Sequence, residues 1–463
     1  MISQWQLRAA FAQRLSDMYG REVPAYTTLV DVSREVNEDV LRTQGADAER
    51  LGSIGRVTAE RHGAIRVGSP EEMRQVARIF GALGMYPVGF YDLREAAASA
   101  IPVVSTAFRP VGAGELARNP FRVFTSLLTP ADPRFFDADL RARLENFLAA
   151  RRLFPPELLA LADRAESAGE LPEADAERFL HLAVQAFELS PEPVDQAWYA
   201  TLERISAVAA DIGGVGSTHI NHLTPRVLDI DELYRRMTER GIEMIDTIQG
   251  PPRWKGPDVL LRQTSFRALA EPRAMRTPDG SVTSGSLRVR FGEVEARGIA
   301  LSREGRARYD RLLARVDDRA AGLPPADRAA LARRLWAEEL PDTERGLAAA
   351  GLAHFTYHLA PDRPRDGSRP PAGLRDLLEG GWLRAEPLVY EDFLPRSAAG
   401  IFQSNLSDEG SRNSDQQGAA YDSAWLSGVL GRDVLDPFDL YEEQQNRSLA
   451  QAARELGLDG TPG

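Results

Sequence analysis

Two distant segments of the chain share the pattern His-x-x-x-Arg-Val, and each is followed by the start of a helix. The first copy begins at His62 and the second at His222. Both copies are short and alternate as strands do, so the histidine and the arginine of each copy share one face. The chain has only six histidines. Recurrence of this pattern therefore predicts a duplicated structural unit.

Each copy leads into a helix-start signal. After the first copy, Ser69-Pro70-Glu71-Glu72 places a proline at the first helical position and acids in the first turn. After the second copy, Asp229 is suited to cap a helix expected at 232–240. The sequence thus predicts a strand followed by a helix in both units.

Three further strands are expected after each helix, because apolar and β-branched residues recur in short runs bounded by Gly and Pro. They are expected at 84–91, 101–108 and 121–127 in the first unit, and at 242–248, 259–269 and 286–297 in the second. The predicted fold class is α+β, with two βαβββ modules forming one curved sheet around a metal site. A helical insertion and additional helices complete it.

The pattern also predicts five segments along the chain. They are an N-terminal helical segment at 1–60, the first module at 61–128, a helical insertion at 129–208, the second module at 209–300 and a C-terminal helical region at 301–463. Within the last segment, a loop and strand near 391–405 are expected to reach the substrate site.

The absence of cysteine restricts the chemistry. It excludes disulfides, thiolate metal sites, iron–sulfur clusters and a cysteine nucleophile. Any metal ion must therefore be held by His, Asp or Glu.

Charge and hydropathy restrict the partners. A net charge of −12, spread along the chain, argues against a nucleic-acid partner. No run approaches the roughly 18–20 apolar residues of a membrane span, and the first residues lack the apolar core of a signal peptide. We expect a cytoplasmic protein without a membrane partner.

Strand parity separates the candidate histidines. His62 shares a face with Arg66, and His222 shares a face with Arg226. His219 differs in parity from His222, so a straight strand cannot direct both at one point. The repeat favours His222 as the functional residue and leaves His219 as a neighbour or a substrate-facing group.

A third component is expected from the segment at 286–297. Parity places two carboxylates, Glu293 and Glu295, at the end of an apolar face formed by Leu287, Val289 and Phe291. Such an arrangement is costly unless a charged group meets the carboxylates. From parity alone, Glu293 and Glu295 are equally plausible as metal ligands, and either could instead form a surface ion pair with Arg290 or Arg297.

Two imidazoles and one carboxylate are typical of the 2-His-1-carboxylate triad of non-haem Fe(II) oxygenases, which leaves coordination positions open. Zinc in a hydrolytic site is the alternative. Without the repeat, each histidine would be interpreted as a structural residue, as we expect for His181, His354 and His358. Arg66 and Arg226 could likewise be solvated charges.

Four segments taken together resemble the 2-oxoadipate dioxygenase/decarboxylase family, a branch of the vicinal oxygen chelate superfamily. They are His62-Gly-Ala-Ile-Arg66, His219-Ile-Asn-His222-Leu-Thr-Pro-Arg226, Phe291-Gly-Glu293-Val-Glu-Ala-Arg297 and Ser397-Ala-Ala-Gly-Ile-Phe402. The resemblance extends over about residues 1–450. It implies Fe(II) held by His62, His222 and Glu293, because the superfamily's last strand reads Phe-x-Glu-x-x-x-Arg.

The resemblance also implies an activity: 2-oxoadipate and O₂ are converted to D-2-hydroxyglutarate and CO₂ in lysine breakdown. The substrate is implied to lie at His62 and His222, with Arg66 on a carboxylate and Arg396-Ser397 contacting it from the C-terminal region. The family has a small apolar residue where this chain has Arg396.

Two alternatives differ in kind. One is another metal-dependent enzyme of this superfamily, such as an extradiol dioxygenase, an isomerase or a hydrolase, since these share the metal site and differ in the pocket. The other is a metal-free protein that binds a small ligand, which predicts neither bound iron nor activity.

Overall fold

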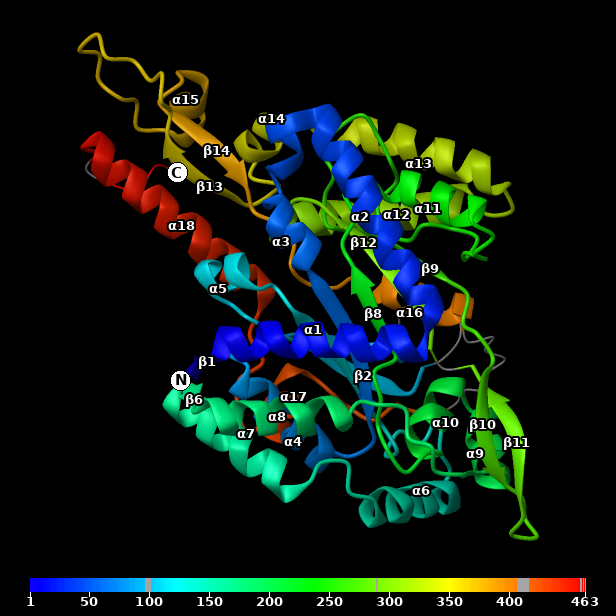
Figure 1. Cartoon of the computed structure of the whole chain (residues 1–463). Coiled ribbons are helices and arrows are strands. Elements are labelled where there is room, and N and C mark those ends of the chain that lie inside the picture. Colours follow the sequence, from blue (N-terminus) through cyan, green and yellow to red (C-terminus); the bar gives the residue numbers. More distant parts are fainter. Residues whose placement is uncertain (96–100, 289, 406–415, 459, 461, 463) are drawn as a thin grey trace.

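A five-stranded sheet lies at the centre of the protein in the computed structural model (Figure 1), which describes residues 1–95, 101–288, 290–405, 416–458, 460 and 462. The strand order is β3-β4-β5-β2-β8. The strands are β2 (Arg61–Val67), β3 (Tyr86–Asp92), β4 (Val103–Arg109), β5 (Arg122–Leu128) and β8 (His222–Pro225). β2 therefore lies between β5 of its own unit and β8 of the second unit.

The first unit has the predicted order. β2 leads into α4 (Pro70–Ala82), where Ser69 and Glu72 form a reciprocal capping box, and β3, β4 and β5 follow. A short helix, α5 (Ala113–Arg118), stands between β4 and β5. β2 pairs parallel with β5, and β3–β4 and β4–β5 pair antiparallel.

The second unit is less regular. β8 leads into α11 (Ile230–Glu239), whose cap Asp229 accepts hydrogen bonds from two backbone N–H groups. β9 (Leu261–Phe266) and β12 (Gly292–Arg297) form an antiparallel pair. The strand expected at 242–248 is absent as a regular element. Only isolated bridges, Met244–Phe266 and Gln249–Gln263, place that stretch beside β9.

The single strand expected at 286–297 is wrong. β11 (Val282–Leu287) pairs with β10 (Glu271–Arg276) in a projecting hairpin (Figure 1), whereas β12 pairs with β9. Arg290, between them, is buried against Glu22 and Glu271, which turns the chain between the two sheets. Strand parity cannot be counted through the break between β11 and β12, and Val289 lies outside the described residues. The parity argument holds within β12, where Glu293 and Glu295 are both buried.

Helices make up most of the N-terminal segment and of the predicted insertion. The first set is α1 (Gln4–Glu22), α2 (Pro24–Gln44) and α3 (Ile54–Ala59). The second set is α6 (Ala138–Ala150), α7 (Pro156–Ala168), α8 (Glu173–Gln185), α9 (Gln196–Glu203) and α10 (Ala207–Gly213). Three two-residue strands, β1 (Ile2–Ser3), β6 (Glu170–Leu171) and β7 (Val194–Asp195), connect these helices to their surroundings.

The C-terminal region combines helices with an antiparallel strand pair that we did not predict, β13 (Phe355–Leu359) and β14 (Leu383–Pro387). Its helices are α12 (Arg303–Arg319), α13 (Pro325–Glu339), α14 (Glu344–Ala349), α15 (Leu374–Glu379), α16 (Pro395–Asn405), α17 (Ser423–Leu430) and α18 (Pro437–Leu456). The strand expected near 391–405 is wrong, because the stretch from Pro395 is helix α16. Proline at the first position and two following alanines favour a helix there.

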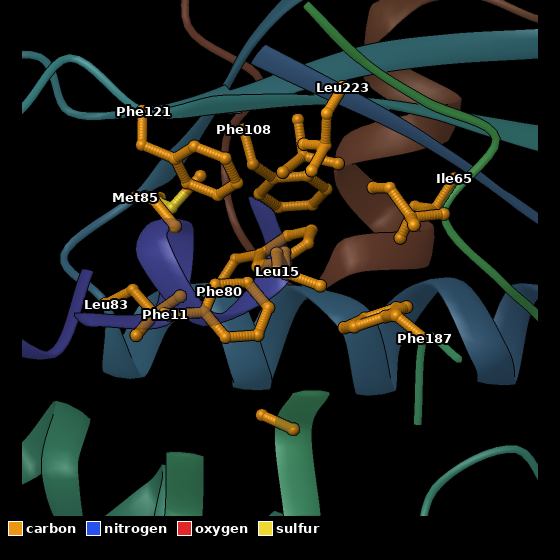
Figure 2. Packing of buried hydrophobic residues seen from close by; sticks show 14 of the residues in the cluster. Phe11, Leu15, Ile65, Phe80, Leu83, Met85, Phe108, Phe121, Phe187 and Leu223 are labelled. Atoms are coloured by element: carbon orange, nitrogen blue, oxygen red, sulfur yellow. The ribbon is translucent and has the colours of Figure 1, made fainter. Parts of the chain in front are cut away.

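The two faces of the central sheet have different roles. Ile65 and Val67 of β2 point into a hydrophobic core covered by α1, α4, α7 and α8, where aromatic rings meet edge to face. Figure 2 shows this packing around Phe11, Phe80 and Phe108. Ala64 points to the other face. Alternation then places His62 and Arg66 on that second face too.

No helix among the described residues is long and apolar enough to cross a membrane.

Candidate metal centre

His62, His222 and Glu293 converge on the second face of the sheet, from β2, β8 and β12. One potential ligand atom from each lies within 4.8 Å of the others. The register explains the meeting of the histidines: Thr224 is opposite His62 and Ala64 is opposite His222, so the two rings are diagonal neighbours. The ring centroids are 5.4 Å apart.

The spacing of these atoms fits a shared metal ion. Nε2 of His62 lies 3.2 Å from Oε1 of Glu293, and Nε2 of His222 lies 3.6 Å from Oε2. Ligand atoms about 2.1 Å from one ion and at right angles to each other are about 3 Å apart. Burial raises the pKa of Glu293 above its usual value. A carboxylate placed there without a cation is costly, so the three residues fit a bound ion.

His222 is prepared as a neutral ligand. Its Nδ1 lies 3.0 Å from Oγ1 of Thr224, which leaves Nε2 facing Glu293. Phe291 stacks on the ring, with centroids 5.2 Å apart. Burial, with the positive charges of His62 and Arg66, lowers its pKa well below the usual value. The imidazole lone pair is therefore available to a metal.

His62 is oriented by the second carboxylate of β12. Its Nδ1 lies 3.0 Å from Oε2 of Glu295, although neither ring nitrogen makes a well-aligned hydrogen bond. Burial opposes the charged form, but Glu295 and Glu293 outweigh it and raise the pKa of His62. Phe393, before α16, meets the ring edge to face with centroids 5.0 Å apart. Glu295 is therefore behind His62, and Glu293 lies between the two histidines.

Glu295 belongs to a buried charge cluster that strand parity could not reveal. Arg297 donates two hydrogen bonds to it, of 2.6 and 2.9 Å, and Arg122 adds a third contact. Burial opposes ionisation, but Arg297 and His62 lower the pKa of Glu295 to about 2. The cluster consists of three carboxylates and four guanidinium groups: Glu60, Glu295, Glu391, Arg56, Arg122, Arg226 and Arg297.

Arg226 has a structural environment. It is fully buried and donates to Oε2 of Glu60 at 2.9 Å, so the alternative of a solvated charge does not hold for Arg226. The two arginines of the repeat thus differ in surroundings. Glu60, Arg122 and Glu391 were missed by the sequence reasoning, because no local pattern marks residues that meet only across the sheet.

Arg66 is also buried, on the same face as His62 and farther along β2. Its Nη1 lies 2.5 Å from Oδ2 of Asp211 in α10. His219 is beside this pair rather than beside Glu293, with Nε2 3.4 Å from Oδ1 of Asp211. Burial lowers the pKa of His219 to about 4, despite Asp211. The prediction that His219 stands apart from the converging histidines agrees with this geometry.

Arg396 and Ser397 begin helix α16. Arg396 is half exposed and reaches Asp317 of α12 at 2.6 Å. Ser397 is buried and lines a cavity of about 740 Å³ between α11, α12, α13 and α16, which also contains Arg262, Tyr309 and Ser404. The side chain of Arg396 is thus engaged with α12.

Replacement of Glu295 by glutamine is expected to lower metal affinity by about 10- to 100-fold, since it weakens the carboxylate that orients His62. Titration of the bound ion against a chelator measures this. Glu391→Gln is the control, because Glu391 belongs to the same charge cluster and His62 is contacted by Glu293 and Glu295 instead. This substitution should leave the metal affinity within about twofold of the wild type. Equal loss in both variants would mean that the cluster, and not the contact with His62, sets the affinity.

The fold and the site define a mixed helix-and-sheet protein with a buried His-His-carboxylate group able to hold a metal ion. Comparison with known proteins agrees: a family model described as 2-oxoadipate dioxygenase/decarboxylase matches residues 11–405. The chain belongs to the 2-oxoadipate dioxygenase/decarboxylase family, and the resemblance inferred from its motifs is confirmed.

Similar proteins match over nearly their whole length. A 2-oxoadipate dioxygenase/decarboxylase of Mycobacterium tuberculosis is 57% identical over 449 residues, covering 97% of each chain. One of Pseudomonas putida is 41% identical over 467 residues, covering 99% of this chain and 98% of the other. The crystal structure of the hydroxyglutarate synthase of Pseudomonas putida in complex with 2-oxoadipate matches with a TM-score of 0.85 and 39% identity, over 99% of each chain.

Proposed function

We propose that this protein is an Fe(II)-dependent dioxygenase/decarboxylase that converts 2-oxoadipate and O₂ into D-2-hydroxyglutarate and CO₂, a step of lysine breakdown. The observation that carries the proposal is the convergence of His62, His222 and Glu293 in a chain that belongs to this family along its length. The reaction balances: the C1–C2 bond breaks, and C1 leaves as CO₂ with its own two oxygens. Both atoms of O₂ stay in the five-carbon product, one in the new carboxylate and one in the hydroxyl group.

Iron is the proposed metal because two imidazoles and one carboxylate, without a thiolate, are typical of non-haem Fe(II) oxygenases. When bound, it supplies chelation of the 2-oxo acid and activation of O₂. His62, His222 and Glu293 would hold it, and such a triad leaves coordination positions open for the substrates. Phe291 and Phe393 pack against the two imidazoles and limit the access of water to them.

Arg66 is the proposed partner of the distal carboxylate. It shares the face of β2 with His62, and four residues along a strand correspond to roughly 13 Å. A guanidinium that leans back from that position can meet a carboxylate several carbons from the metal, through charge-assisted hydrogen bonds. Ser397, buried at the start of α16, is proposed to contact the substrate as well. Since the side chain of Arg396 is directed to Asp317, any contact from that residue falls to its backbone.

We also propose that the two units are copies of one βαβββ module. The first strand lies parallel to the last in the first unit, β2 with β5, and a parallel bridge from Arg226 to Glu295 relates β8 to β12 in the same way. The stretch at 242–248 then corresponds to β3, and β9 to β4. In this arrangement His222 is the counterpart of His62, which supports their joint role.

Arg66→Ala is expected to raise the KM for 2-oxoadipate by about 10- to 100-fold, the value of a charge-assisted hydrogen bond, while iron content is unchanged. Steady-state O₂ uptake and metal analysis of the anaerobically loaded protein give the two numbers. Equal loss of iron and of substrate affinity would contradict this assignment of Arg66.

The proposed function as a whole is tested with a panel of 2-oxo diacids added to anaerobically Fe(II)-loaded protein before O₂ is admitted. We expect O₂ uptake and CO₂ release in equal amounts with 2-oxoadipate, and 2-hydroxyglutarate as the product. Bound iron without O₂ uptake on any diacid would reject the oxygenase, and failure to bind iron would favour the small-ligand binding protein.

A further inference from the structure

A compact polar cluster lies on the second face of the central sheet, the face that also carries the candidate metal centre. It joins Arg66 of β2 to three residues that lie outside the metal-binding triad: Asp211, His219 and Asn221. All four are at most 4% exposed. Asp211 comes from α10, which spans the predicted boundary at 208–209 and precedes β8. Deep burial of an arginine and a carboxylate requires that each be compensated by the other.

The contacts define the hydrogen-bond roles in this cluster. Oδ2 of Asp211 accepts from Nη1 of Arg66 at 2.5 Å and from Nδ2 of Asn221 at 3.0 Å. A carboxylate can only accept, so the amide nitrogen of Asn221 must face Asp211. The same nitrogen lies 3.2 Å from Nε2 of His219. Nε2 therefore accepts, and the ring proton of a neutral His219 is on Nδ1.

Three atoms of this cluster retain hydrogen-bonding capacity. Nδ1 of His219, Oδ1 of Asp211 and Oδ1 of Asn221 are buried and have no hydrogen-bond partner within the described part of the chain. Buried polar atoms are nearly always paired with protein, water or ligand. The three atoms belong to Asp211, which contacts Arg66, and to the two residues that contact Asp211, so hydrogen-bonding capacity is concentrated in the residues beside the guanidinium.

Asp211 also sets the charge of the environment. With Arg66 it forms a neutral pair, and His219 adds no charge. Without Asp211, the buried guanidinium of Arg66 would lose its carboxylate partner and the contact that fixes one of its edges. Asp211 thus fixes the position of one edge of the Arg66 guanidinium.

We propose that Asp211 is a positioning residue that holds Arg66 toward the substrate and so sets the preference for 2-oxo acids with a second carboxylate. This inference rests on the proposed function. It assigns α10, the helix that precedes β8, a part in substrate selection. Asn221 donates a hydrogen bond to the carboxylate of Asp211, and the ring of His219 lies beside the same carboxylate.

The experiment compares two substrates of equal carbon number, 2-oxoadipate and 2-oxohexanoate, which lacks the second carboxylate. Asp211→Asn keeps one acceptor for Arg66 and removes the charge, while Asp211→Ala removes both. We expect kcat/KM for 2-oxoadipate to fall, mainly through KM, by about tenfold or more in Asp211→Ala and by less in Asp211→Asn. Values for 2-oxohexanoate should change by less than about twofold, and iron content should be unchanged.

A double-variant cycle separates positioning from a general structural effect. In the Arg66→Ala background, Asp211→Asn should no longer change the KM for 2-oxoadipate, because the residue through which it acts is gone. Asp132→Asn is the matched control, since Asp132 is equally buried and pairs with Arg94 and Arg134. Its substitution can lower stability but should leave the ratio between the two substrates as in the wild type.

The outcomes are distinguishable. If Asp211→Asn behaves as the wild type, affects both substrates equally, or keeps its effect in the Arg66→Ala background, Asp211 does not act through Arg66 and the inference is overturned. If Asp211→Ala fails to fold, Asp211→Asn carries the comparison. Absence of O₂ uptake by the wild-type protein with 2-oxoadipate would instead reject the proposed function itself.

Discussion

Glu293→Ala is expected to abolish metal binding and to lower kcat/KM for 2-oxoadipate by more than about a thousandfold, or about 4 kcal/mol of transition-state stabilisation. Its carboxylate lies between the two imidazoles, 3.2 Å from Nε2 of His62 and 3.6 Å from Nε2 of His222. Without Glu293, only the two imidazoles of the triad remain, and the triad supplies no negative charge to the ion. Metal analysis of the purified protein and O₂ uptake measure the two effects.

A second substitution at this position, Glu293→Gln, separates a metal ligand from a structural residue. Burial disfavours ionised Glu293, as the raised pKa indicates. Glu293→Gln should therefore not lower the free energy of unfolding of the metal-free protein, although metal binding is lost. Glu239→Ala, at an exposed position of α11, is the control and should retain both metal and activity. A Glu293 variant with wild-type metal content would contradict the assignment.

Glu60→Ala is expected to destabilise the protein by about 3–5 kcal/mol, the usual cost of removing one partner from a buried ion pair. Glu60 accepts from Arg122 at 2.6 Å and from Arg226 at 2.9 Å, and all three are fully buried or nearly so. Its loss leaves the backbone carbonyl of Leu51 as the remaining hydrogen-bond acceptor of Arg226 within the described part of the chain. Urea unfolding measures the change.

An exposed pair provides the comparison for that stability effect. Glu177→Ala breaks the surface pair with Arg14, whose side chains are 65% and 37% exposed, and should cost less than about 1 kcal/mol. Similar losses in the two variants would mean that the buried cluster contributes no more than a surface ion pair.

The pH dependence follows from the direction of the Glu60 shift. Burial opposes ionisation, but Arg226 and Arg122 outweigh it and hold the pKa of Glu60 well below its usual value. Because the pKa is lower in the folded state, the stability that Glu60 contributes is present above its unfolded-state pKa and is lost as pH falls through its folded-state pKa. The stability difference between wild type and Glu60→Ala should thus be constant near neutral pH and shrink only in acid.

Much of the first unit and the two histidines of the candidate metal centre follow from local sequence patterns. The alternation of β2, the capping box at Ser69 and the cap at Asp229 are written within a few residues, so the sequence predicts them without tertiary information. Parity and the repeat are also sufficient to favour His222 over His219, since parity depends on spacing along one strand and the repeat on the recurrence of that spacing in a second segment.

Long-range pairing decided the rest. Glu293 and Glu295 share a face of β12, and only the position of that strand beside β8 places one between the imidazoles and the other behind His62. Strand parity could not extend across the turn at Arg290, because Glu22 and Glu271 hold that residue from distant elements.

The sequence by itself therefore determined which side chains share a strand face and where the helices begin, because these properties depend on neighbours in the chain. Strand parity left Glu293 and Glu295 equal, and the motif resemblance favoured Glu293. The tertiary structure alone decided that Arg226 is the arginine of the repeat held in the Glu60 cluster, and that Asp211 meets Arg66 from a helix 145 residues away. Burial and charge pairing between distant elements have no signature in local spacing, and this is why the environment of the site emerged only from the fold.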